Sequence, residues 1–177
     1  SQSRRTLLPF LRPRPVPAPP PTAARAIKTE GTNMAVRRDV LVALEAFDPG
    51  FAFFLDETDL NLRIMRAGHA TAIVPRAEVH HGYAASPRRR ADRVPRDLFD
   101  IGASWAVFQR KYVPERERLD HWHGLRQVER RRLVTHMVAG RLEPGDVRRL
   151  MRRLDQGYGQ GLDRHRGGAQ VARSAAS

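Results

Sequence analysis

The chain has 177 residues, of which 41% are hydrophobic and 29% charged, and this composition excludes collagen, a coiled-coil rod and a wholly disordered polymer. It has no cysteine, which excludes disulfides, thiolate zinc sites and cysteine nucleophiles. Its 32 Lys and Arg outnumber 19 Asp and Glu, and the resulting charge of +13 favours anionic partners.

Residues 1–26 are predicted to form an extended arm. Seven prolines fall in residues 9–21, and their fixed φ angles and missing amide donors favour polyproline II over helix or central strand. A disordered linker is the alternative on composition. The opening residues lack the apolar region of a signal peptide, and no apolar run reaches the roughly 18 to 20 residues that span a bilayer.

Residues 27–96 are predicted to be mixed α/β. Asp39 can begin a helix that runs to about Ala46. A second helix is expected from Asp56, and Gly68 would end it. Short extended pieces are expected at residues 34–36, 71–74 and 78–81.

The remaining chain is predicted to be a helical region, 97–156, followed by a flexible tail, 157–177. Apolar spacing indicates helices at residues 98–112, 125–138 and 144–154, with Pro144 suited to the first helical position. The glycines that begin at Gly157 predict fraying.

Acidic residues Asp56, Glu57 and Asp59 cluster at the start of the predicted second helix. Acids at this position satisfy orphan amides and complement the helix dipole, and Asp59 can pair with Arg63 one turn later. The same position can also project one carboxylate into a cleft as a general base. Both interpretations remain open from the residues alone.

Two further segments carry candidate site residues. His80 and His81 end a short extended piece, where neighbouring side chains point to opposite faces, so only one of them can face a given site. A structural, hydrogen-bonded histidine is the alternative. Residues Gly31-Thr32-Asn33-Met34 begin with a glycine and include an asparagine, the residue types that tolerate left-handed turns.

Four motifs occur in one order: GTNMAVRRDVL, FDPGF, FLDETDLNLRIMRAGH and VPRAEVHHG. Together they cover residues 31 to about 86. Their order and spacing resemble the C-terminal half of the catalytic domain in family 2 glycosyltransferases. The resemblance implies a partial GT-A (Rossmann-like) α/β domain, lacking its N-terminal nucleotide-binding half and followed by the helical region.

The resemblance also implies roles in an inverting sugar transfer. Glu57 would be the catalytic base that deprotonates an acceptor hydroxyl, with Asp56 as the fallback. Asp59 and Arg63 would hold the start of the helix rigid beside the reacting groups. The physics agrees, because a hydroxyl is a poor nucleophile until it loses its proton, and a departing diphosphate needs nearby positive charge.

Substrates and metal follow from the same resemblance. His81 would lie by the diphosphate of a nucleotide-sugar donor and its divalent metal, Mg or Mn. Gly31, Thr32, Asn33 and Met34 would line the side that binds a glycan or lipid-linked glycan acceptor. Arg88 to Arg90 can approach the diphosphate from a loop, and a solvated charge run is the alternative.

The family's first half should precede residue 31 by about a hundred residues, whereas 30 residues precede it here, without an Asp-x-Asp motif. We therefore expect either a fragment of a longer transferase, with the metal mostly ligated by the missing half, or a remnant that has lost donor binding. In both cases the chain is expected to be inactive alone. Family analogy suggests cell-envelope glycans and a cytoplasmic location, compatible with peripheral contact at the inner face of the membrane.

A second hypothesis is a basic helical module that binds nucleic acid or an anionic membrane surface without catalysis. Residues 84–177 carry 21 Lys and Arg against 11 Asp and Glu. However, their arginines alternate with Leu and Val at amphipathic spacing, as on a solvated helix face. No nucleic-acid motif or aromatic stacking platform accompanies them, so nucleic acid is the less favoured partner.

Overall fold

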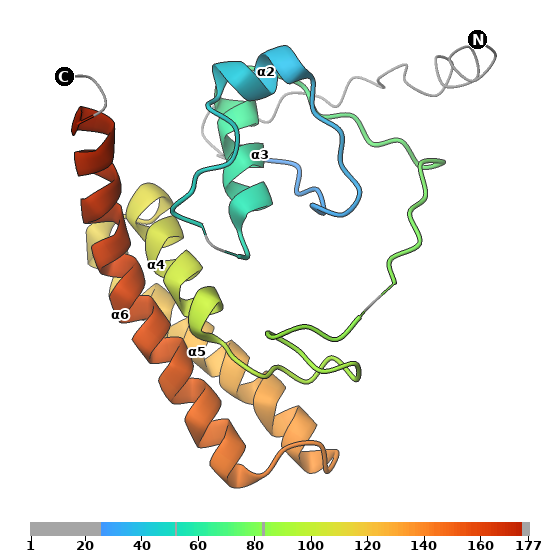
Figure 1. The fold of residues 1–177 in the computed structure, drawn as a ribbon, viewed down its shortest axis with the longest axis vertical. Helices are drawn as coiled ribbons and strands as arrows, with labels where there is room; N and C mark the ends of the chain where they lie inside the picture. The colour runs from blue at the N-terminus through green and yellow to red at the C-terminus, as the bar shows by residue number, and fades with distance from the viewer. Residues whose placement is uncertain (1–25, 52, 83, 175–177) are drawn as a thin grey trace. The chain divides into compact units, whose positions relative to one another are not determined.

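The computed structural model describes residues 26–51, 53–82 and 84–174, with side chains described as far as Arg164. The predicted arm therefore lies almost wholly outside the described residues. Within these ranges the chain forms five helices (Figure 1): α2 (Arg38–Ala43), α3 (Asp56–Arg66), α4 (Phe99–Tyr112), α5 (Glu115–Val138) and α6 (Pro144–Ser174).

The prediction of an α/β, partial GT-A domain is wrong. The described residues form no sheet, and their strand content is limited to isolated bridges that join Ser86 to Arg89 and Arg89 to Pro95. Residues 71–74 and 78–81 have no partner strand to satisfy their backbone groups, and Ile73 is 67% exposed. Alternating apolar and polar residues predicted strands there, but a strand is stable only when it pairs with a neighbouring strand. The described fold is mostly α-helical.

The chain divides into two compact units. Among the described residues, unit 1 comprises 26–48 and 57–82, and unit 2 comprises 49–51, 53–56 and 84–174.

Unit 1 has a small core in which Val40 of α2 packs with Leu60 and Ile64 of α3. The predicted second helix is confirmed, because α3 begins at Asp56 and Gly68 (φ 78°) follows its end. There the amides of Gly68 and His69 donate to the carbonyls of Met65 and Ile64, the paired bonds of a Schellman cap.

Helix α2 ends earlier than predicted, at Ala43 rather than about Ala46. Glu45 and Ala46 both adopt left-handed backbone conformations, with φ of 58° and 57°. These angles are incompatible with continuing a right-handed helix. The chain turns there, and the carbonyl of Ala46 becomes available to α3.

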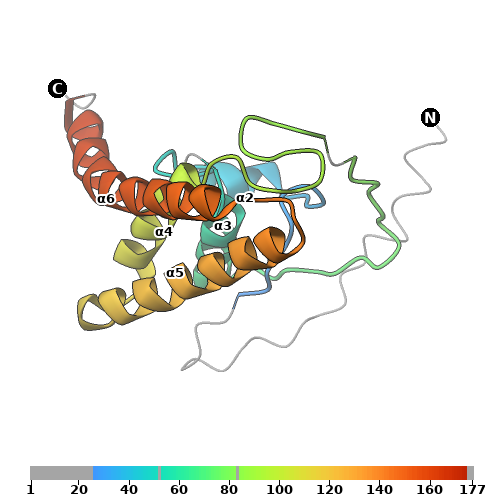
Figure 2. The ribbon, with the colours of Figure 1, turned by 90° about the horizontal axis from the view of Figure 1, so that it is seen from below.

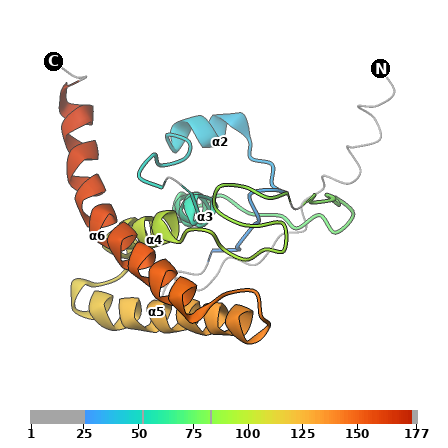
Figure 3. The same cartoon turned by 60° about the horizontal axis from the view of Figure 1, so that its bottom comes forward.

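Unit 2 is a helical assembly in which α4 and α5 both pack against α6 (Figures 2 and 3). The prediction of α4 is confirmed, whereas α5 begins at Glu115 rather than Leu125. The core of unit 2 contains these buried residues: Val94, Leu98, Trp122, Leu133, Leu142, Val147, Leu150 and Leu154. Trp122 stacks on Tyr158 of α6 with ring centroids 3.8 Å apart.

Helix α6 continues to Ser174, although the sequence predicted an end at Leu154 and fraying from Gly157. The glycines explain the difference. A Cβ atom on Gly157 would overlap the backbone of Phe99 in α4, and one on Gly161 would overlap Ala103. Gly102 of α4 meets the backbone of Leu154 in the same way. These glycines therefore permit close contact between two helices rather than a flexible tail.

Candidate functional site

The acidic cluster lies at the start of α3. Asp56 and Glu57 are half-buried, and Asp59 is completely buried. Gly31, which lies far from Glu57 in the sequence, is its neighbour in space, since a Cβ on Gly31 would lie 3.9 Å from the Cβ of Glu57. The structure thus brings together two of the segments that the sequence singled out.

Asp59 and Arg63 form a rigid connection between α3 and the end of α2. Arg63 Nε donates to Asp59 Oδ2 at 2.8 Å. The same guanidinium donates to the carbonyl oxygens of Leu44 at 2.5 Å and Ala46 at 2.7 Å. Because these bonds hold the buried carboxylate and the guanidinium in place, they position α3 relative to the turn after α2.

The segment that contains Gly31 is fixed by polar contacts on both sides. The backbone amide of Asn33 donates to the carbonyl of Glu30 at 2.9 Å and closes a turn. Asn33 Nδ2 donates to the carbonyl of Ala77 at 2.9 Å, and Asn61 Nδ2 of α3 donates to Thr29 Oγ1 at 2.9 Å. The turn is therefore tied to α3 and to the extended segment before His81.

The other acceptor-side candidates differ in burial. Gly31, Thr32 and Asn33 are exposed, whereas Met34 is half-buried against the core of unit 1. Sequence reasoning missed Asn61, which is 3% exposed and hydrogen-bonds to the segment before this turn. A polar residue next to the buried Leu60 of an amphipathic helix was the available signal.

His81 is exposed in a segment without regular secondary structure. Among the described residues, no group of three or more His, Asp or Glu side chains is arranged to hold a metal ion. A metal held mostly by the family's first half would not need such a group here, so the role of His81 beside a metal stays a prediction, and the chemistry below includes no step through a metal.

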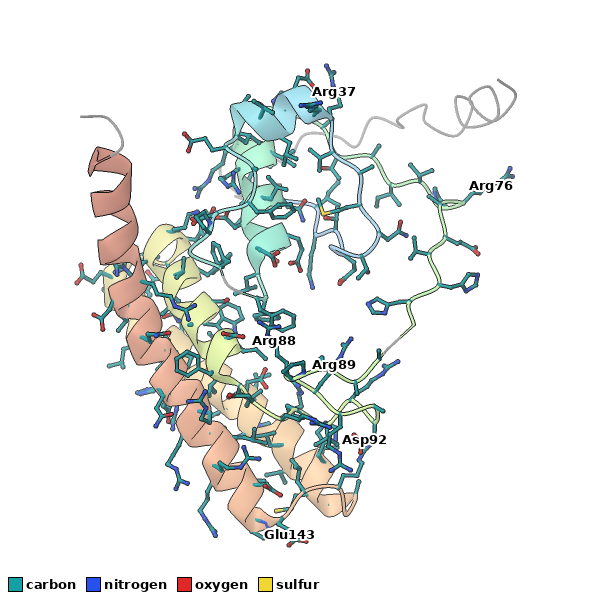
Figure 4. The ribbon with its side chains drawn as sticks, viewed as in Figure 1. Arg37, Arg76, Arg88, Arg89, Asp92 and Glu143 are labelled. Carbon is teal, nitrogen blue, oxygen red and sulfur yellow. The ribbon has the colours of Figure 1, made fainter. Side chains whose placement is uncertain are left out.

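The arginine run before α4 makes ion pairs in unit 2. Arg88 Nε donates to Asp100 at 2.8 Å, and its guanidinium lies 4.4 Å from the centre of the Phe53 ring. Arg90 lies 3.1 Å from Asp92. Figure 4 shows Arg88, Arg89 and Asp92 on the chain before α4. These pairs give Arg88 and Arg90 structural roles in unit 2.

Unit 2 contains a second candidate site, a groove of about 540 Å³ between α5 and α6. We call it the α5–α6 groove. Basic and apolar side chains dominate its lining: Arg126, Arg130, Arg148 and Arg152, with Val134, Met137, Val147 and Met151. The amphipathic spacing of Arg130, Arg148 and Arg152 predicts a solvated face on each helix. Their convergence from two helices depends on packing that no single-helix pattern reveals.

Arg126 differs from the other arginines of the groove because it has an acidic partner. Its Nε and Nη2 donate to the two carboxylate oxygens of Asp155 at 2.6 and 2.9 Å. Hydrogen bonding to Asp155 outweighs burial and raises the pKa of Arg126 above its usual value. No acidic partner pairs with Arg130, Arg148 or Arg152 within the part of the chain that the structure describes.

A partly buried imidazole lies near the end of α5. Burial, assisted by the charges of Arg141 and Arg132, lowers the pKa of His136 below its usual value, although Asp92 opposes the shift. Its Nδ1 is buried without a hydrogen-bond partner. Both observations favour the neutral ring in the folded protein.

No helix in the described ranges is long and apolar enough to cross a membrane. No family model, curated protein or solved structure matches the chain.

Proposed function

We propose that this chain supplies the acceptor-side, catalytic-base part of an inverting glycosyltransferase. The observation that carries the proposal is the proximity of Gly31 and Glu57, whose Cβ positions would be 3.9 Å apart. The resemblance to family 2 glycosyltransferases assigns these two segments to the acceptor side and the base. The proposal depends on these residues of unit 1 and requires no sheet.

The proposed step is a single displacement. The oxygen of an acceptor hydroxyl attacks the anomeric carbon of a nucleotide sugar, and its proton passes to the Glu57 carboxylate. The bond between the anomeric carbon and the diphosphate oxygen breaks, so the nucleotide diphosphate leaves with the electron pair and the anomeric configuration inverts. A carboxylate within hydrogen-bond reach of the hydroxyl is suited to this proton transfer.

Asp59 and Arg63 act as positioning residues in this proposal. Asp59 is completely buried and bonded to Arg63, which also binds the carbonyls of Leu44 and Ala46. Their contacts fix the helix that carries Glu57, which is what a general base needs to keep its geometry during the reaction. Asp56, at the first position of α3, remains the alternative base.

Donor binding needs more than the described residues provide. The diphosphate of the donor requires positive charge or a metal, and the described side chains include no group suited to hold a metal. The test therefore uses the product of the complete reading frame that contains these 177 residues. The nucleotide sugar and the glycan or lipid-linked acceptor would be identified by screening a panel of each.

Glu57→Gln is the decisive variant, with Glu45→Gln as the matched control. Glu45 is an exposed glutamate of the same unit, on the turn after α2. We expect Glu57→Gln to lower the transfer rate by about 10² to 10⁴ and to leave donor binding, measured by calorimetry, nearly unchanged. Glu45→Gln should behave as wild type. A wild-type rate for Glu57→Gln would remove this residue as the base.

A further inference from the structure

The α5–α6 groove combines two properties that a solvated helix face does not need. Arg130, Arg148 and Arg152 are exposed around it, while Val147 is buried and Met151 is half-buried. Charged groups therefore surround an apolar interior that is contributed by both helices. Such a site can bind a ligand that is anionic at one end and apolar at the other.

Charge in the groove is unbalanced. Both carboxylate oxygens of Asp155, the acidic residue of the lining, accept hydrogen bonds from Arg126. That leaves the positive charges of Arg130, Arg148 and Arg152 without a pairing acid among the described residues. Planar guanidinium groups bind phosphate oxygens in a bidentate manner, which makes a phosphate the complementary anion.

The interior of the groove distinguishes between sources of phosphate. Val134, Met137, Val147 and Met151 are aliphatic or thioether side chains. Nucleic acid without base pairing is held by aromatic stacking, which these residues cannot provide, and free phosphate would leave the apolar interior in water. An acyl chain next to a phosphate headgroup would cover it, and methionine adapts to flexible apolar ligands.

We propose that the α5–α6 groove binds the phosphate headgroup and adjoining acyl chain of an anionic phospholipid and thereby docks unit 2 on a lipid surface. Arg130, Arg148 and Arg152 bind the headgroup, and the apolar residues contact the start of the chain. The volume of about 540 Å³ lies within the range of small-molecule sites. This inference is independent of the proposed sugar transfer.

The first experiment measures binding of the full chain to vesicles by co-sedimentation. Vesicles of phosphatidylcholine alone are compared with vesicles that also contain phosphatidylglycerol. The triple variant Arg130→Gln, Arg148→Gln, Arg152→Gln is expected to bind the anionic vesicles about a hundredfold more weakly than wild type, given the usual contribution of each arginine at an anionic surface.

The matched control removes the same charge elsewhere. Arg38, Arg131 and Arg141 are exposed and do not line the groove, so the triple variant with Gln at these positions should retain most of the binding. Helicity measured by circular dichroism checks that both variants fold. Equal losses in the two variants would show that the overall charge alone drives binding, and would overturn the proposal.

A second pair of variants tests the apolar interior on one helix. Val134→Asp puts a carboxylate into the groove, whereas Val128→Asp makes the same change on α5 at a residue that is 58% exposed and outside the groove. We expect the first to abolish binding to anionic vesicles and the second to weaken it severalfold at most. Indistinguishable effects would refute a site in the groove.

Competition separates the lipid from other phosphates. A short-chain, soluble phosphatidylglycerol should displace the protein from vesicles at concentrations where inorganic phosphate does not. Equal potency of the two would reassign the groove to free phosphate. Tighter binding of a single-stranded oligonucleotide than of vesicles, lost in the groove variant, would instead establish nucleic acid as the ligand.

Discussion

Replacing Gly157 with alanine should destabilise unit 2, although alanine is the better helix former. A Cβ on Gly157 would overlap the carbonyl oxygen, carbonyl carbon and Cα of Phe99 in α4. These are backbone atoms, so no side-chain rotation relieves the overlap, and α4 and α6 must separate. Gly159 lies on the same helix, and a Cβ there has nothing within 4 Å.

The two substitutions share the gain in helix propensity and differ in the cost of overpacking. Alanine stabilises a helix interior by about 0.5 to 1 kcal/mol relative to glycine, and Gly159→Ala should show this gain. At Gly157 the same gain is opposed by overpacking, which costs about 1 to 3 kcal/mol in a well-packed interior and more against backbone. Because the gain is common to both variants, their difference equals the overpacking cost. The overlap is with backbone, so we expect Gly157→Ala to be the less stable variant by the upper end of that range, about 3 kcal/mol or more.

Urea unfolding of the full chain, followed by circular dichroism, measures the difference. With a slope of about 1 to 3 kcal/mol per molar urea for small proteins, the two midpoints should differ by roughly 1 M or more. Both variants need the same slope for this comparison. Equal midpoints, or a higher midpoint for Gly157→Ala, would show that α6 does not pack closely on α4 at this glycine.

Two further predictions concern charged groups. Arg63→Ala should lower the unfolding free energy by about 3 to 5 kcal/mol in urea titrations, because it removes the cationic partner of the buried Asp59 carboxylate. Arg37→Ala, which breaks an exposed pair with Asp39, should have an effect within about 1 kcal/mol, and similar losses in the two variants would contradict the role of Arg63. For His136, the lowered pKa means that its contribution to stability is complete above the unfolded pKa of about 6.5 and is lost as the pH falls through the folded value. Thermal unfolding of wild type should therefore lose stability below pH 6.5 more steeply than that of His136→Gln, and parallel pH profiles would refute this assignment.

Local signals in the sequence determined several helices. The apolar spacing of Leu60 and Ile64 and the stop at Gly68 predicted α3, which the structure confirms. The start of α6 at Pro144 and nearly the whole of α4 were also predicted. These features depend on capping and on periodicity within one helix, and such information is contained in consecutive residues.

Predictions that depended on partners were less successful. Residues 71–74 and 78–81 have strand-like patterns, yet strands exist only where a neighbouring strand completes their hydrogen bonds, and none does so in the described ranges. The motifs around Gly31 and Glu57 predicted candidate site segments from the sequence. Gly31 and Glu57 are neighbours because the turn at residues 30–33 lies beside α3, and the sequence pattern does not contain this contact.

Tertiary packing alone decided the roles of the glycines and arginines in unit 2. From its sequence neighbours, Gly157 cannot be told apart from a glycine in a flexible segment. The backbone of Phe99 lies beside it in the structure, and this contact excludes a larger side chain. Arg130 of α5 and Arg148 of α6 each resemble a solvated charge on its own helix. They form one groove because the two helices pack together, and a contact between distant segments is not encoded in the periodicity of either one.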